Sequence, residues 1–234
     1  MKTIDYIYDG LKIVQDDSHL KYGTDALFLS AFARGTSKAR AVDLGCGNGV
    51  IALALAYLNK AQSVVGVELQ ESSAVLARES VAVNGYESKV EILNADFTAM
   101  SGEYCGSFDY AVANPPYMKV KSGKANAYDS MNIARHEVGC DIYSLCKAAS
   151  RLVKFGGYLY TVYRPDRITD LFDALRSNKF EIKRLTFVCA RKDLEPCLVL
   201  TEAKLGAAAG TKVTPVFFIS DEKKMKEIYE GGSL

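Results

Sequence analysis

The sequence lacks the features that indicate a membrane or exported protein. It has no apolar run of about eighteen residues, the length that a membrane-spanning helix needs. Its opening residues, Met1-Lys2-Thr3-Ile4-Asp5, carry no apolar stretch like that of a signal peptide. It also has no internal repeat and no low-complexity linker. With 234 residues, of which 49% are hydrophobic, we expect a cytoplasmic chain with one large domain or a domain with a small appendage.

Metal-binding and redox motifs are also missing. No two of the six cysteines form a Cys-x-x-Cys pair, and the two histidines form no cluster. We therefore expect no metal site and thiols that stay reduced. The formal net charge is only +1, so a nucleic-acid surface would have to come from local clustering of basic residues.

The chain begins with a predicted β-hairpin over residues 4–8 and 11–14, because Asp9-Gly10 is a strong two-residue turn signal between alternating apolar residues. A helix should follow, with Thr24 or Asp25 as its N-cap and an apolar run over residues 26–33. We treat residues 1–36 as one unit of hairpin and helix.

Strands and helices then alternate, which is typical of a doubly wound parallel sheet. The predicted strands are residues 41–44, 64–68, 90–93, 108–113 and 158–163, and the predicted helices are residues 50–58, 72–84, 142–153 and 165–177. Residues 185–189 and 197–203 lie too close for a helical crossover and should pair antiparallel. We expect this domain to cover residues 37–205, with a C-terminal extension over residues 206–234 packed on it.

Three successive strand ends carry groups that suit a nucleoside ligand. The first runs into Asp43-Leu44-Gly45-Cys46-Gly47-Asn48-Gly49 and an apolar helix, so backbone amides face a ligand at a helix start. A dinucleotide fingerprint would want glycine where Val50 stands. The second strand ends at Glu68, which can accept both hydroxyls of a ribose. The third leads to Asp96-Phe97, an acceptor for an adenine amino group and a ring for stacking; the alternatives are a helix cap and a core residue.

The fourth strand end carries the most specific motif, Asn114-Pro115-Pro116-Tyr117. Two prolines cannot continue a strand, and Pro115 pushes Asn114 into an extended conformation. The tetrapeptide therefore offers fixed acceptors beside an aromatic face, which suits a planar group that carries an NH2. A double-proline turn that only closes the strand is the alternative.

Residues 39–203 resemble the class I S-adenosylmethionine-dependent methyltransferases. The resemblance implies an α/β, Rossmann-like fold with a seven-stranded, mostly parallel sheet, an antiparallel last strand and helices on both faces, here preceded by the hairpin. It implies that Asp43 holds the methionine part of the cofactor, Glu68 its ribose and Asp96 its adenine, with S-adenosylhomocysteine as product. The full implied cofactor-binding set is Tyr22, Gly23, Thr24, Asp43, Gly45, Gly47, Asn48, Glu68, Leu69, Asp96, Phe97 and Asn114.

The tetrapeptide matches the motif of amino-methyltransferases within this class, which implies catalytic roles for Asn114, Pro115 and Tyr117. Their substrates include the adenine amino group and the side-chain amide of glutamine. A protein glutamine-N5 methyltransferase would carry a larger helical domain before the glycine turn, and a guanine-N2 ribosomal RNA enzyme usually has phenylalanine at the position of Tyr117. A non-catalytic cofactor-binding module would not need Asn114 and Tyr117 together.

A closer resemblance extends over nearly the whole chain. Lys21-Tyr22-Gly23-Thr24-Asp25-Ala26, Ala134-Arg135-His136-Glu137 and Glu202-Ala203-Lys204 look like segments of the bacterial tRNA adenine-N6 methyltransferases that act on tRNA for valine. The implied target is N6 of the adenosine 3′ of the anticodon. Tyr22 stands where phenylalanine is more usual. We expect tRNA as the partner, no protein partner and RNA contacts from Tyr117, Lys119, Lys121, Lys124, Arg135, Arg164 and Arg167, with Arg191 and Lys192 as further candidates.

Overall fold

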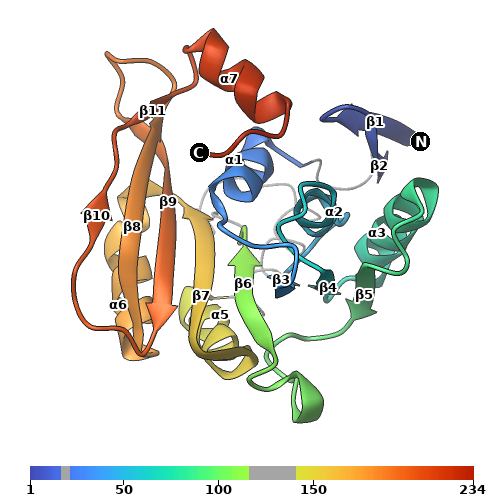
Figure 1. The fold of residues 1–234 in the computed structure, drawn as a ribbon, viewed down its shortest axis with the longest axis horizontal. Coiled ribbons are helices and arrows are strands. Elements are labelled where there is room, and N and C mark those ends of the chain that lie inside the picture. The colour runs from blue at the N-terminus through green and yellow to red at the C-terminus, as the bar shows by residue number, and fades with distance from the viewer. Residues whose placement is uncertain (17–21, 116–140) are drawn as a thin grey trace, which may run out of the picture.

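The alternating strands and helices form one mixed β-sheet in the computed structural model of the protein (Figure 1). The structure describes residues 1–16, 22–115 and 141–234. The strands are β1 (Lys2–Ile7), β2 (Leu11–Asp16), β3 (Arg40–Leu44), β4 (Ser63–Glu68), β5 (Val90–Asn94), β6 (Phe108–Ala113), β7 (Val153–Tyr163), β8 (Phe180–Cys189), β9 (Pro196–Leu205), β10 (Lys212–Val213) and β11 (Phe217–Phe218). The helices are α1 (Thr24–Phe32), α2 (Val50–Tyr57), α3 (Glu71–Asn84), α5 (Ile142–Leu152), α6 (Ile168–Ser177) and α7 (Glu222–Tyr229).

The strand order of the main sheet is β10-β8-β9-β7-β6-β3-β4-β5, with β11 also paired to β8. Strand β9 runs antiparallel to its neighbours β7 and β8, whereas β7, β6, β3, β4 and β5 are parallel. The predicted Rossmann-like class is therefore confirmed. The predicted count of seven strands was too low, because β10 and β11, of two residues each, extend the sheet beyond β8.

The two faces of the sheet bury separate apolar clusters, as strict alternation along the strands requires. Along β6, Tyr110 and Val112 face the cluster that holds α1, α2 and part of α3. Ala111 and Ala113 face the cluster that holds α5 and α6. Helices thus cover both faces and leave the carboxyl ends of the parallel strands as the edge where a ligand can approach.

The N-terminal hairpin packs on the first of these layers through α3. The backbone N–H of Lys12 donates to Asn84 Oδ1 (2.9 Å), and that of Val14 donates to Ser80 Oγ (2.9 Å). Asn84 Nδ2 returns a bond to the carbonyl of Lys12 (2.7 Å). Side chains of α3 therefore satisfy backbone groups on the edge of β2 that the hairpin itself leaves unpaired.

Several predicted boundaries shift in the structure. The N-cap of α1 is Gly23, not Thr24 or Asp25; Asp25 instead accepts a bond from the N–H of Ala26 (2.9 Å) within the first turn. The helix predicted from residue 165 starts as a 3₁₀ turn, Pro165–Arg167, before α6. Strand β7 runs through Gly156-Gly157, although the sequence predicted a strand only from residue 158. Glycine is needed at position 157, because a Cβ there would lie 2.8 Å from the Asp109 carbonyl.

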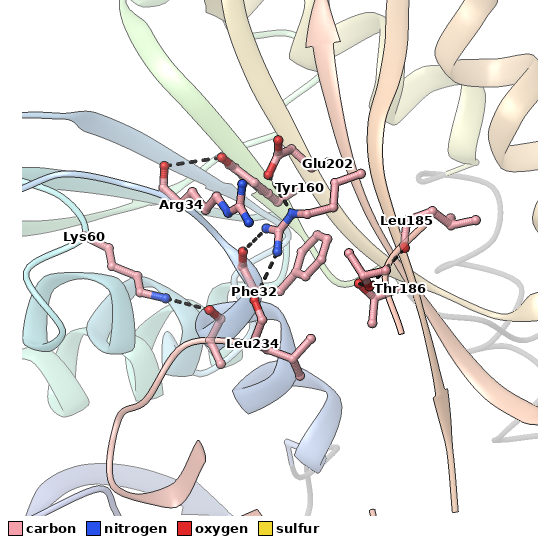
Figure 2. A network of polar contacts seen from close by, with 11 residues as sticks. Phe32, Arg34, Lys60, Tyr160, Leu185, Thr186, Glu202 and Leu234 are labelled. Atoms are coloured by element: carbon pink, nitrogen blue, oxygen red, sulfur yellow. Dashed lines mark hydrogen bonds and ion pairs between the residues drawn. The ribbon is translucent and has the colours of Figure 1, made fainter. Parts of the chain in front are cut away.

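A buried arginine joins the sheet, α1 and the C-terminal tail (Figure 2). Arg184 on β8 is 3% exposed, and its Nε donates to Glu202 on β9 (3.0 Å). Its other nitrogens donate to the carbonyls of Phe32 and Leu234, and the guanidinium lies 3.6 Å from the centre of the Phe32 ring. Strand β8 starts earlier than the sequence indicated because this partnered arginine occupies a core position.

Lys60 lies beside this network and is also buried, and it donates to the carbonyls of Ser30 (2.7 Å) and Ala31 (2.8 Å). Burial, with a smaller contribution from the charge of Arg184, lowers the pKa of Lys60 to about 8. Across the described ranges, no helix is long and apolar enough to cross a membrane.

Candidate cofactor and acceptor site

The strand pairing places the predicted site residues side by side at the carboxyl edge of the sheet. Asp43 on β3 pairs with Gly66 on β4 and with Val112 on β6, so the glycine turn that follows β3 lies beside the ends of the strands that carry Glu68 and lead into Asn114. Glu68 in turn pairs with Asn94 on β5, two residues before Asp96. Neighbouring strands lie about 4.8 Å apart. The acceptor motif, glycine turn, ribose acid and adenine acid therefore follow one another in the order of the strands.

The turn between β3 and α2 needs glycine for its backbone conformation. Gly45, Gly47 and Gly49 have φ angles of 77°, 55° and 83°, in the left-handed region that other residues avoid. Apart from its chain neighbours, a Cβ added at Gly45 or Gly47 would have no atom of the described residues within 4 Å. The N–H groups of Gly45 and Cys46 both donate to the Val67 carbonyl, at 2.9 and 3.0 Å, which ties the turn to β4.

Asp43 is fully buried directly below this turn. Its Oδ2 accepts a bond from the N–H of Ala52 on α2 (3.1 Å), and its Oδ1 has no hydrogen-bond partner within the described residues. The pKa of this carboxyl is raised to about 7, mainly by burial and to a smaller extent by the charge of Glu68, while the bond from the Ala52 N–H lowers it. The site thus contains a buried acceptor that a positively charged donor would satisfy.

Glu68 is 8% exposed and already has a fixed orientation. Its Oε2 accepts from the N–H of Gly47 (2.9 Å) and its Oε1 from the N–H of Gln70 (2.8 Å). Each carboxylate oxygen can accept a second bond, so both remain available to a vicinal diol. The backbone bonds hold the two oxygens in place before any ligand binds.

Asn94 has a supporting role that the sequence reasoning missed. Its Nδ2 donates to the carbonyls of Glu68 (2.9 Å) and Leu69 (3.0 Å), so it ties the end of β5 to the end of β4. Its place at a strand end, two residues before Asp96, was the signal that could have revealed it. Leu69 itself is 58% exposed beside this junction.

The two residues predicted to hold the adenine have different surroundings. Asp96 is exposed, and its Oδ1 accepts bonds from the N–H and the hydroxyl of Thr98, both at 2.7 Å. Phe97 is 7% exposed and packs in the cluster with α5 and α6, so its ring has little free surface. Core packing, the alternative weighed for Phe97, is the arrangement seen, and its stacking on a base stays a prediction.

On the acceptor side, Asn114 is half-buried and Pro115 buried just beyond β6. The pairing of Ala113 with Thr161 places Tyr163 level with Pro115, so Arg164 and Arg167 lie at the neighbouring strand end. The guanidinium of Arg167 lies 5.6 Å from the centre of the Tyr163 ring. The predicted residues Tyr117, Lys119, Lys121, Lys124 and Arg135 lie outside the described residues.

Three residues of the predicted cofactor-binding set, Tyr22, Gly23 and Thr24, line a different part of the structure from these strand-end residues. They line a cavity that the hairpin and α7 share, and its lining includes none of the predicted site residues from the ends of β3, β4, β5 and β6. Their predicted contact with the cofactor stays a prediction.

The strand-end residues fit a ligand that carries an amino group, a ribose diol and a purine. The unpartnered Asp43 Oδ1 suits an ammonium group, the two oriented oxygens of Glu68 suit a diol, and Asp96 suits a ring amino group. Among the described residues, none beyond the chain neighbours lies within 4 Å of the position that a Cβ would take at Gly45 or Gly47, so these residues leave the backbone of the turn accessible to a ligand. S-adenosylmethionine carries these groups in this order.

Comparisons with known proteins agree with this geometry. The family model described as "Methyltransferase small domain" matches residues 17–167, more than half of the chain. A Porphyromonas gingivalis protein is 30% identical over 86% of this chain and 81% of its own length. A Bacteroides fragilis protein is 32% identical over 70% of this chain and 68% of its own length. Both are named tRNA1(Val) (adenine(37)-N6)-methyltransferase.

A third relative of the same name, from Erwinia tasmaniensis, is 32% identical, and the chain spans 61% of its length. Among solved structures, a predicted O-methyltransferase from Agrobacterium tumefaciens superposes with a TM-score of 0.73 at 21% identity, over 90% of this chain and 98% of that one. TYW2 of M. jannaschii, solved with AdoMet, superposes with a TM-score of 0.59 at 15% identity, over 87% and 85% of the two chains. The chain therefore belongs to the methyltransferase small domain family, whose methyl donor is S-adenosylmethionine.

Proposed function

We propose that the chain transfers a methyl group from S-adenosylmethionine to N6 of an adenosine in tRNA, and that this adenosine lies directly 3′ of the anticodon of tRNA(Val). The observation that carries the proposal is the pairing of Asp43 on β3 with Val112 on the adjacent strand β6, so the strand that leads into the glycine turn lies beside the strand that leads into Asn114. The names of the relatives support the choice of tRNA and of adenine. We assign the activity to residues 37–205.

The donor half of the site positions the cofactor. Asp43 would hold the ammonium group of the methionine part, Glu68 the two ribose hydroxyls and Asp96 the adenine amino group. S-adenosylmethionine, when bound, supplies a methyl group activated by a positively charged sulfur. The residues of this chain contribute orientation, which can lower a barrier by several kcal/mol, or about 7–11 in the best cases.

The acceptor half must act on a poor nucleophile, because the lone pair of an adenine amino nitrogen is delocalised into the ring. Asn114 Oδ1 and the carbonyl of Pro115 would accept the two N–H bonds of that amino group. These bonds favour a pyramidal nitrogen and direct its lone pair at the methyl group. The surplus proton can leave to water, so no side chain is required as a base. Tyr117 would stack on the adenine.

RNA binding would use cations at strand ends near the acceptor. Arg164 and Arg167 follow β7, the neighbour of the strand that carries Asn114, and Arg191 and Lys192 follow β8 at the same edge. Such cations hold phosphates while the bases of a single-stranded loop are splayed out. This substrate would place the protein in the cytoplasm.

The test is methyl transfer from labelled S-adenosylmethionine into total RNA and total protein from cells that lack the gene. The proposal predicts label in the tRNA fraction, recovered as N6-methyladenosine after digestion to nucleosides. Label in protein would instead identify a glutamine methyltransferase, and label in ribosomal RNA as N2-methylguanosine would identify a guanine enzyme. Binding of the cofactor with no methyl transfer to RNA or protein would instead indicate a non-catalytic cofactor-binding module.

A further inference from the structure

The cavity lined by Tyr22, Gly23 and Thr24, of about 470 Å³, lies between the β1–β2 hairpin, the start of α1 and the end of α7. No strand-end residue of the cofactor site lines it. The residues that give it its chemistry come from segments far apart in the sequence: Asp5, Ile7, Gln15, Tyr22, Leu27 and Tyr229. In Figure 1 the hairpin and α7 lie near each other, and α1 lies beneath α7.

Asp5 gives this cavity a fixed carboxylate. The amide Nε2 of Gln15 donates to Asp5 Oδ2, and Gln15 is only 3% exposed, so the carboxylate is held from the core side. Burial raises the pKa of Tyr22, and the neighbouring Asp5 and Tyr229 raise it further. Asp5, Tyr22 and Tyr229 thus lie close together, and all three line the cavity.

Among the described residues, the charge of the lining disfavours anions. None of these described lining residues is lysine, arginine or histidine, while Asp5 contributes a carboxylate. A phosphate would be repelled here, whereas a group with N–H donors would be attracted. A ligand of this cavity must therefore bring the donors itself.

The apolar part of the cavity suits a flat ring. Tyr229 is 45% exposed although it is a large aromatic residue, and the half-buried Tyr22 also lines the cavity. Ile7 and Leu27 supply an apolar floor. Aromatic side chains of this kind hold unstacked bases of single-stranded RNA, and a carboxylate reads an exocyclic amino group.

We propose that this cavity binds a second, amino-bearing base of the RNA substrate, adenine or cytosine, with its ring against Tyr229 and its amino group on Asp5. The inference rests on the proposed function, since it assumes an RNA substrate. The cavity then acts as a specificity site for one base of the RNA other than the methylated adenosine. The phosphates of the RNA lie outside the cavity.

The test measures binding of short fluorescein-labelled oligo(A), oligo(C) and oligo(U) by anisotropy. The wild type should bind oligo(A) and oligo(C) more tightly than oligo(U), since uracil lacks the amino group. Tyr229→Ala should weaken oligo(A) and oligo(C) binding by about 5- to 150-fold, the effect of losing one stacked base. Tyr229→Phe should bind like the wild type. The matched control is Tyr143→Ala on α5, where Tyr143 is also 45% exposed, and it should change nothing.

Asp5→Ala tests the carboxylate separately. It should reduce the affinity for oligo(A) and oligo(C) to that for oligo(U), with an unchanged melting temperature as the check on folding. Equal binding of the three oligonucleotides by the wild type, or wild-type affinity in Tyr229→Ala, would overturn the inference. Methyl transfer by the wild type into tRNA, measured in parallel, is independent of these results, so the cavity can fail while the proposed function stands.

Discussion

Below neutral pH the protein should lose affinity for S-adenosylmethionine, because Asp43 must be ionised to hold the ammonium group. Its carboxyl is fully buried, with Oδ2 bonded to the N–H of Ala52 and Oδ1 unpartnered within the described residues. Burial raises its pKa to about 7 in the free protein. At pH 8 most molecules therefore carry the charge, and at pH 6 only about one in ten does.

The size of the change in cofactor affinity follows from the fraction of molecules in which Asp43 is ionised. The dissociation constant should rise about tenfold between pH 7.5 and pH 6, and about tenfold more for each further unit of pH. Asp43→Asn keeps an acceptor for Ala52 but removes the charge. This variant should bind the cofactor about 10- to 150-fold more weakly at pH 8, the range for one hydrogen bond to a charged group, and its affinity should not change with pH in this range.

The pH dependence of folding stability gives an independent check, because it runs in the opposite direction to the pH dependence of cofactor affinity. A carboxyl whose pKa is raised by folding contributes stability that is fully present below about pH 4 and is lost as the pH rises through about 7. Asp43→Asn should therefore unfold at higher urea concentrations than the wild type at pH 8, and the gain should shrink toward pH 4.

Isothermal titration with S-adenosylhomocysteine, which keeps the ammonium group, measures the binding at several pH values. Its buffers should have different ionisation enthalpies, so that proton release on binding can be counted near pH 6. A dissociation constant that stays flat from pH 6 to pH 8 in the wild type would refute the reasoning. So would wild-type affinity in Asp43→Asn.

Three further predictions concern other parts of the structure. Glu68→Gln should weaken S-adenosylhomocysteine binding by about 10- to 100-fold in the same titration, because the amide cannot serve both the backbone N–H groups and the ribose. Arg164→Ala should raise the KM for tRNA and reduce the salt dependence of tRNA binding by about one in log–log slope, with the cofactor KM unchanged. Arg184→Met should destabilise the protein by about 3–5 kcal/mol in urea unfolding, because Glu202 would stay buried without its partner, and adding Glu202→Leu should restore most of the loss.

Much of the fold could be predicted from the sequence because local signals agree with the tertiary structure. The apolar residues of β3, β4 and β6 read as buried strands, and Gly85 ends α3 in the left-handed conformation expected of it. The hairpin also formed as predicted, but its loop has three residues and not two, because Ile7 pairs with Leu11 and Tyr8 leaves the strand with a φ of 47°. At these positions neither packing nor pairing has to overcome the local preference.

The errors arose where distant residues decide the local structure. The start of β8 reads as polar because Arg184 looks like a surface residue, and only Glu202, Phe32 and Leu234 make its burial possible. Strand β10 has two residues, too few for any pattern.

The site shows the same contrast between features that local sequence signals predict and features that distant residues decide. The positions of Asp43, Glu68 and Asp96 at strand ends followed from the order of the elements. The pKa of Asp43 did not, because it depends on burial by α2. The cavity at Tyr229 was not visible in the sequence either, since it forms only when the hairpin, α1 and α7 meet.

Nucleoside analysis of tRNA(Val) tests the central claim most directly. An unmodified transcript incubated with S-adenosylmethionine and the wild-type protein should gain one N6-methyladenosine, at the adenosine 3′ of the anticodon. Asn114→Ala should bind S-adenosylhomocysteine within a few-fold of the wild type and lose this product by orders of magnitude. No N6-methyladenosine from the wild type, or near-normal turnover by Asn114→Ala, would contradict the account.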